Sequence, residues 1–215
     1  MKVDAMDSSK MRKLLISTGI GGVAGFLVAF TLIRTVDSGL LGAIDTSRSI
    51  AALVASLYLL CGAFVGIGLL NPRLGEKFLN VEDADELREQ MTMLRYSVFT
   101  IISIGVCLFM LALAAPAGPV PVEIAVAVIA ALMIACIFTS RRQMAVVDEL
   151  IKSVSRESTS TAFYTLFVVG GGWAMLAHLG YVAGPAALDW VTMFAVVMLF
   201  GAFWACGRRG LLFPR

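Results

Sequence analysis

The side chains best suited to chemistry in this 215-residue chain are its single histidine, His178, and the nearby Asp189. An imidazole beside a carboxylate can bind a ligand, respond to pH or transfer a proton. Glu123 lies at a comparable position, at the end of another apolar segment. We therefore take His178, Asp189 and Glu123 as a candidate ligand or pH-sensing site. The alternative is an interfacial histidine hydrogen-bonded to a loop, beside an ordinary belt of aromatic residues.

The four cysteines give little indication of a chemical role. None of the four stands in a CxxC pair and all lie in apolar segments, at positions 61, 107, 136 and 206. Cysteine in such surroundings acts mostly as a small hydrophobic residue, and the spacing of metal ligands is missing. The sequence also contains no nucleophile elbow, phosphate loop, zinc-protease motif or haem-attachment motif. It therefore predicts no metal, no cofactor and no catalytic residue, and the interpretation leans away from an enzyme.

Glycines gather at three places that could bring helices together. Gly21 and Gly25 lie in the first apolar segment, Gly62 and Gly66 in the second, and Gly170, Gly171 and Gly172 in the fifth. In lipid, helices associate through close backbone approach, which glycine permits. We expect these residues to pack helices within one bundle or between protomers. The other interpretation makes the triple glycine a hinge or an unwound segment lining a substrate site, as in transporters.

The elements that must position these residues are apolar helices. The chain is 59% hydrophobic and only 15% charged, whereas soluble domains carry about 25% charged residues. A stretch of about 20 apolar residues spans the roughly 30 Å hydrocarbon core as a helix, which satisfies its own backbone. The sequence predicts an all-α, polytopic bundle forming a single transmembrane domain over residues 1–215, with six spans at about 14–33, 50–70, 96–115, 122–139, 162–182 and 187–206.

The positive residues predict how the spans are oriented. With six spans, all of the 17 Lys and Arg residues except Arg34 and Arg48 fall on one side. Positive residues near helix ends stay in the cytoplasm. The topology is therefore predicted as N-in and C-in. The first span follows a basic start, yet its apolar run is too long for a signal peptide and no cleavage site follows, so we expect it to be retained.

Two cytoplasmic helical extensions are predicted from the longer connections. Asp83 and Glu86 have capping-box spacing at the start of a short helix, 83–96, that enters the third span. Residues 141–158 have helical apolar spacing, so we expect the fourth span to continue into the cytoplasm. Ser158 and Thr161 bound a polar run that would then stop this helix and begin the next.

The same two connections share a short sequence, Asp-Glu-Leu, at 85–87 and 148–150. Spans two and three could therefore be a parallel duplicate of spans four and five. Three residues are little support, and the repeat stays open at this point.

Function is constrained mainly by what the spans do not carry. None has a charged residue near its middle, whereas ion-coupled pumps generally need such groups. We expect first a non-enzymatic scaffold or accessory subunit, acting through its glycine faces or cytoplasmic helices on a protein partner or a second copy. The alternative is a small transporter or channel for an uncharged or apolar solute. The third is a membrane enzyme or cofactor-binding protein centred on His178 and Asp189.

The surroundings predicted for the chain follow from the same features. Its first partner is the lipid bilayer, in a multi-pass arrangement, and the lack of a basic stripe interleaved with aromatics argues against nucleic acid. The absence of disulfide-like pairing fits a bacterial cytoplasmic membrane, that is, a plasma membrane.

Overall fold

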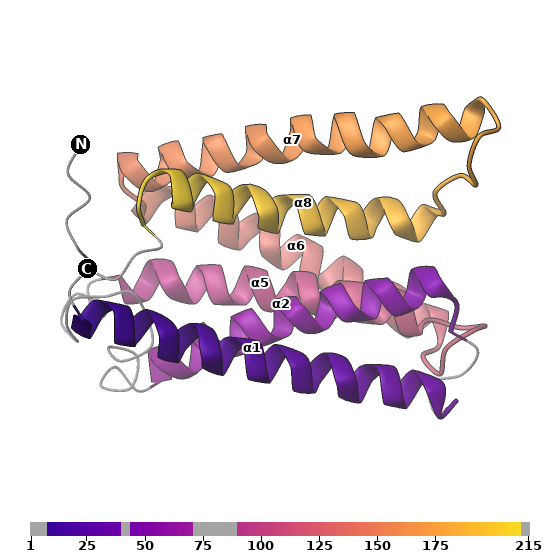
Figure 1. The fold of residues 1–215 in the computed structure, drawn as a ribbon, viewed down its shortest axis with the longest axis horizontal. Helices are drawn as coiled ribbons and strands as arrows, with labels where there is room; N and C mark the ends of the chain where they lie inside the picture. Colours follow the sequence, from indigo (N-terminus) through magenta and orange to yellow (C-terminus); the bar gives the residue numbers. More distant parts are fainter. Residues whose placement is uncertain (1–7, 40–43, 71–89, 212–215) are drawn as a thin grey trace.

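The computed structural model describes residues 8–39, 44–70 and 90–211, and these residues form six helices (Figure 1). Apart from one isolated bridge between Ala114 and Val120, the rest of the described chain consists of turns and bends. The helices are α1 (Ser8–Asp37), α2 (Thr46–Leu70), α5 (Met91–Leu113), α6 (Val122–Val146), α7 (Glu149–His178) and α8 (Ala187–Arg208).

Each of these six described helices is long and apolar enough to cross a membrane. The predicted all-α class and the six apolar segments are thus confirmed. The fifth helix ends earlier than the predicted 162–182, at His178, because Gly180 adopts a positive φ of 80° and turns the chain. Glycine adopts this left-handed conformation without steric cost, so it commonly ends helices.

The prediction for the connection between the fourth and fifth spans is wrong. The chain leaves the helix at Val147, whose ψ is 146°, and a new helix begins directly afterwards. Asp148 caps it, since its carboxylate accepts a hydrogen bond from the Ile151 amide at 2.7 Å. Ser158 lies buried inside α7 instead of ending a helix. The polar extension therefore belongs to the start of α7, because Asp148 already caps a helix ahead of the later serines and threonines.

The other predicted extension, 83–96, lies mostly outside the described residues, which resume at Gln90. There α5 begins at Met91, and the Gln90 side chain makes no capping hydrogen bond. The capping box of Asp83 and Glu86 belongs to the part of the chain that is not described.

Three helices form the centre of the bundle and three lie outside it. α2 packs along α5 and also contacts α8, whereas α1 packs on α2, α6 on α5 and α7 on α8. In Figure 1, α1 and α7 lie on opposite edges of the bundle. Of the residues in the apolar stretches, 28–33% are buried in α2, α5 and α8, but only 6–11% in α1, α6 and α7. The outer helices are thus held by one neighbour each.

Small residues bring neighbouring helices close together. A Cβ at Gly105 of α5 would lie 3.1 Å from the Ala55 carbonyl oxygen of α2, and one at Gly201 of α8 would lie 2.5 Å from the Ser158 carbonyl oxygen of α7. Backbones that approach this closely gain van der Waals contact, which drives helix association in lipid. The buried core between them includes Ala55, Tyr58, Leu108 and Ala195.

The packing gives no support to an internal repeat. α2 and α5 pack along each other, whereas α6 and α7, their counterparts in the proposed duplication, do not pack together in the described structure. In Figure 1 these two helices diverge from their connection at Val147 and Asp148.

Candidate functional site

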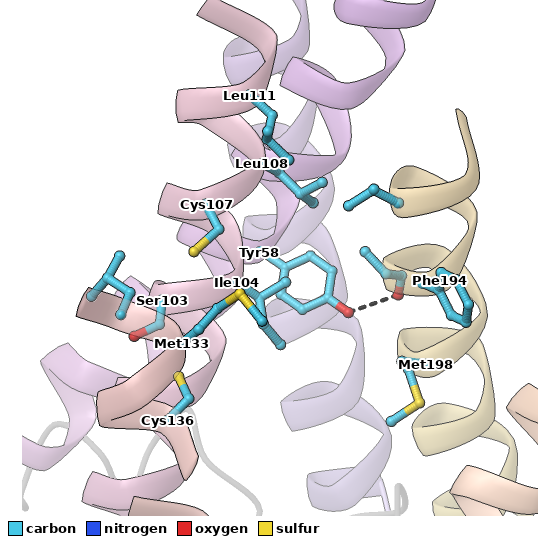
Figure 2. Close-up of a pocket in the computed structure, with 13 residues that line it drawn as sticks. Tyr58, Ser103, Ile104, Cys107, Leu108, Leu111, Met133, Cys136, Phe194 and Met198 are labelled. Carbon is cyan, nitrogen blue, oxygen red and sulfur yellow. Dashed lines mark hydrogen bonds between the residues drawn. The ribbon is translucent and has the colours of Figure 1, made fainter. Parts of the chain in front are cut away.

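A cavity of about 310 Å³ lies between the α5–α6 pair and α8, with α2 behind it (Figure 2). Ligand sites in proteins typically measure about 300–1,000 Å³ and are mostly apolar. The cavity is lined by Tyr58, Ser103, Ile104, Cys107, Leu108, Leu111, Leu132, Met133, Cys136, Val191, Phe194, Ala195 and Met198. It is therefore large enough to hold part of a ligand, and its chemistry suits an apolar one.

Tyr58 is the main polar group at this cavity, and it is already engaged. Its side chain is only 3% exposed, and its hydroxyl donates a 2.7 Å hydrogen bond to the Ala195 carbonyl oxygen (Figure 2). The bond joins α2 to α8 across the inner side of the cavity. A buried hydroxyl needs such a partner, since leaving it unsatisfied in an apolar interior costs free energy.

The remaining polar side chains that line the cavity are one hydroxyl and two thiols. The Ser103 hydroxyl donates to the Phe99 carbonyl oxygen of its own helix at 2.7 Å. Cys107 on α5 and Cys136 on α6 are both half-buried free thiols. The lining is mostly apolar, and the arrangement can hold an apolar group.

A second cavity, of about 380 Å³, adjoins the first at the ends where α2 and α8 begin. The two share Leu111 and Val191 as lining residues, so they lie next to each other. The second is more polar, since Asp45, Ser47 and Arg48 line it beside residues 186–188. We call the first the inner cavity and the second the mouth.

Arg48 is held at the mouth by the end of α5. Its Nη1 donates to the Ala112 carbonyl oxygen at 3.1 Å and to the Ala114 carbonyl oxygen at 2.6 Å. Carbonyls at a helix C-terminus carry partial negative charge and no helical partner, which favours a cation there. Asp45 caps α2, because its carboxylate accepts from the Arg48 amide at 2.8 Å.

The predicted site residues are not among those that line the two cavities; they are His178, Asp189 and Glu123. His178 is the exposed last residue of α7, and Glu123 is exposed in the first turn of α6. The Asp189 carboxylate accepts a 2.7 Å hydrogen bond from the Ala186 amide and so closes the first turn of α8. Among the described residues no hydrogen bond or ion pair joins these three, and no cluster of His, Cys, Asp or Glu could hold a metal ion.

The predicted packing glycines fall into two groups. A Cβ at Gly62 would lie 2.5 Å from Ile102 on α5, one at Gly170 would lie 2.9 Å from Trp190 on α8, and one at Gly66 would lie at ordinary contact distance from α5. These three face neighbouring helices. For the others, no neighbouring atom of the described chain lies within 4 Å of such a Cβ; they are Gly21, Gly25, Gly171 and Gly172.

Sequence reasoning missed several residues that matter here. Gly105 and Gly201 make the closest backbone approaches, and Tyr58 and Arg48 flank the two cavities. Tyr58 gave a usable signal, since it lies in the middle of a span although tyrosines prefer the membrane interfaces. Gly201 gave another, because Gly201 and Ala205 have the small-xxx-small spacing.

The opposite end of the α7–α8 pair carries an ionic cluster. The Glu157 carboxylate on α7 accepts from Arg209 at 2.8 Å and from Arg208 at 3.3 Å. Arg209 also donates to the Ser153 hydroxyl at 2.9 Å. The cluster fixes the end of α8 against α7, at the end of the bundle where α6 finishes and α7 begins (Figure 1).

Comparisons with protein-family profiles, curated proteins and solved structures find no match to this chain. The class of this protein is therefore assigned from its fold alone. The chain is an all-helical, multi-pass membrane protein.

Proposed function

We propose that this chain is a non-enzymatic membrane protein that acts by binding a partner within the bilayer, as a scaffold or accessory subunit. The observation that supports it most is the loose attachment of the outer helices. α1 and α6 each have 6% of their apolar stretch buried and α7 has 11%. Helices attached on one side only leave long faces for lipid or for another protein.

The uncovered glycines favour another protein over lipid on two of those faces. Glycine inside a helix costs about 1 kcal/mol relative to alanine, and in membranes it is enriched where backbones approach closely. Gly62, Gly105, Gly170 and Gly201 each meet a neighbouring helix, whereas Gly21, Gly25, Gly171 and Gly172 do not. A partner helix packed on α1 or α7 would lie against these four glycines, just as neighbouring helices lie against the first four.

The proposal includes an orientation. The ends of α2, α6 and α8 and the starts of α5 and α7 lie together at one end of the bundle, which carries Arg95, Arg141, Arg142 and the cluster of Arg208 and Arg209 (Figure 1). By the positive-inside rule this end faces the cytoplasm, with both termini on that side. A bacterial cytoplasmic membrane is the expected location, and the polar start of α7 is the expected cytoplasmic extension.

The test replaces an uncovered glycine by a large residue. No neighbouring atom of the described chain lies within 4 Å of a Cβ at Gly171, so Gly171→Leu is expected to fold and to obstruct an outside contact. The expected result is loss of a stoichiometric partner or defined oligomer that the unaltered chain retains in mild detergent. The measurement is light scattering coupled to size exclusion, with mass spectrometry of the co-purified proteins.

The matched control is Val168→Leu on the same helix, where the side chain is 68% exposed and already bulky. It should retain the partner. An unaltered chain that purifies as an inert monomer would contradict the proposal. So would retention of the partner by all three variants, Gly171→Leu, Gly21→Leu and Gly25→Leu.

The alternative, a small transporter or channel for an uncharged or apolar solute, is favoured by one observation. The inner cavity and the mouth together reach from one end of the bundle to Tyr58 and Met198. Transport would need a second opening at the cationic end. An enzyme centred on His178 and Asp189 has less support, because the Asp189 carboxylate is engaged at its own helix start.

A further inference from the structure

The inner cavity and the mouth have the dimensions of one leaflet of a bilayer. Arg48 at the mouth and Tyr58 at the inner end lie on the same helix, separated by about ten residues, which a helix covers in roughly 15 Å. Half of a hydrocarbon core of about 30 Å has the same depth. Along α8 the lining residues run in parallel, from Leu188 to Met198. The two cavities thus extend from the membrane interface to its middle.

The inner cavity opens sideways toward lipid. Three of its lining residues are strongly exposed on the outside of the bundle: Met133 of α6 is 59% exposed, Phe194 of α8 is 54% exposed and Met198 is 42% exposed. α6 and α8 are not among the helix pairs that pack along each other in the described chain, so the cavity is open on the side between them. An acyl chain can therefore enter from the bilayer without crossing the protein.

The mouth supplies charges that match a lipid headgroup. The described structure uses only Nη1 of the Arg48 guanidinium, so its Nε and Nη2 donors have no hydrogen-bond partner among the described residues. A guanidinium is well suited to bind a phosphate through two parallel N–H groups. The Asp45 carboxylate stands beside it and complements the cationic part of a zwitterionic headgroup.

We propose that the inner cavity and the mouth are a binding site for one membrane phospholipid, with its phosphate at Arg48 and one acyl chain between α6 and α8 reaching toward Tyr58. This inference goes beyond the partner-binding proposal and does not depend on it. The occupied leaflet is the one at which α2 and α8 begin, opposite the cationic end of the bundle. The bound chain would fill the open space between α6 and α8 and link the α7–α8 pair to α5 and α6.

The experiment uses the full chain in phosphatidylcholine vesicles that contain a small fraction of phosphatidylcholine with a diazirine near the end of one acyl chain. After illumination, labelled residues are mapped by mass spectrometry. Labelling at Met133 and Met198 should exceed that at Phe167, a 69% exposed residue of α7, by about tenfold. Equal labelling at all three would mean ordinary boundary lipid and would overturn the proposal.

Two variants test the chain part of the site. Cys107→Phe places a ring into the inner cavity and should reduce labelling at Met198 to the level found at Phe167. Val168→Phe adds the same ring on a lipid-facing surface outside the cavity and should leave the labelling at Met198 unchanged. Retained labelling at Met198 in the Cys107→Phe variant would contradict occupation of this cavity.

The headgroup part is tested with a diacylglycerol that carries the same diazirine but no phosphate. It should label Met198 about tenfold less than the phospholipid, the effect expected for loss of a charge-assisted hydrogen bond. Arg48→Gln should lower the labelling by phosphatidylcholine to that of diacylglycerol and leave the diacylglycerol labelling unchanged, which shows that the cavity itself persists. Equal labelling by both probes in the unaltered chain would rule out headgroup recognition.

A final arm distinguishes bulk phospholipid from another phosphate-bearing amphiphile. Unlabelled phosphatidylcholine should dilute the labelling at Met198 in proportion to its amount. If an equal amount of a polyprenyl phosphate abolishes the labelling while phosphatidylcholine does not, the site is selective for that other class and the phospholipid proposal fails.

Discussion

Single glycines in this chain have opposite roles that depend on what lies beside them. Gly201 faces the backbone of α7, where a Cβ would lie 2.5 Å from the Ser158 carbonyl oxygen and 3.3 Å from the Ala162 nitrogen. Backbone atoms cannot move aside as the end of a flexible side chain can. At Gly171 the same Cβ would meet no neighbouring atom in the described chain.

Alanine at these two positions should therefore change stability in opposite directions. Gly201→Ala should lower the free energy of unfolding by about 1–3 kcal/mol, because it overpacks the α7–α8 contact. Gly171→Ala should leave it unchanged or raise it by up to about 1 kcal/mol through helix propensity. The measurement is denaturant unfolding of the monomer in detergent micelles, and equal effects of the two variants would show that α7 and α8 do not approach as described.

Arg34 and Arg48 are the two positive residues predicted on the opposite side from all the others, and in the structure each interacts with a neighbouring group. Arg48 donates to the carbonyl oxygens of Ala112 and Ala114 at the end of α5. The Arg34 guanidinium carbon lies 5.2 Å from the centre of the Phe30 ring, within the range of a cation–π interaction. Positive charges on the predicted outer side thus have specific local interactions, while those at the other end are clustered.

Among the helices, the boundary between α6 and α7 shows how one residue decides where an element begins. Val147 takes an extended conformation and Asp148 caps the next helix. The apolar spacing of residues 146–154 is compatible with a continuous helix, so periodicity by itself does not locate the break. A short connection of this kind reverses the chain and lets α6 and α7 separate.

Removal of the cap should loosen the start of α7. Asp148→Ala is expected to cost about 1 kcal/mol, because the Ile151 amide loses its side-chain partner. Hydrogen exchange at the amides of Ile151 and Lys152 should speed up. The control Glu149→Ala removes the exposed ion pair with Lys152 and should cost much less than the loss of the cap. If both variants exchange alike, the cap does not hold this helix start.

At the level of the whole molecule, the six described helices divide into a central group and an outer group. Burial is concentrated in α2, α5 and α8, and α1, α6 and α7 are each attached to one of them. Such a bundle presents most of its outer surface to lipid. This arrangement suits both proposals: a partner on the uncovered faces of α1 and α7, and a phospholipid in the opening between α6 and α8.

The orientation of the whole molecule gives the last prediction. In a cysteine-free background, a single Cys at Ala183, in the turn after α7, should react with a membrane-impermeant thiol reagent from outside intact cells. A single Cys at Ser155, near the exposed start of α7, should react only after the cells are opened. The physical reason is the cationic end of the bundle, which the positive-inside rule keeps in the cytoplasm. Reaction of both positions from outside would contradict the N-in, C-in topology.

The sequence by itself determined the class of the molecule and the number of apolar segments. Lipid as a solvent requires long apolar helices, and each such helix can be recognised from its own run of residues, such as 122–139 and 187–206. It also predicted seven packing glycines, and of these Gly62, Gly66 and Gly170 lie beside a neighbouring helix of the described chain. The candidate site of His178, Asp189 and Glu123 followed from residue types only, and the structure uses Asp189 as a helix-terminal partner.

Only the tertiary structure decided which faces are covered and where the cavities lie. Gly170 and Gly171 are adjacent and chemically identical, yet one meets Trp190 and the other meets no neighbour in the described chain. The inner cavity is formed by residues from α2, α5, α6 and α8, and apart from Tyr58 their ordinary apolar character gives no local sign of a site. Its existence depends on how these four helices pack together, which a linear pattern of apolar residues does not encode.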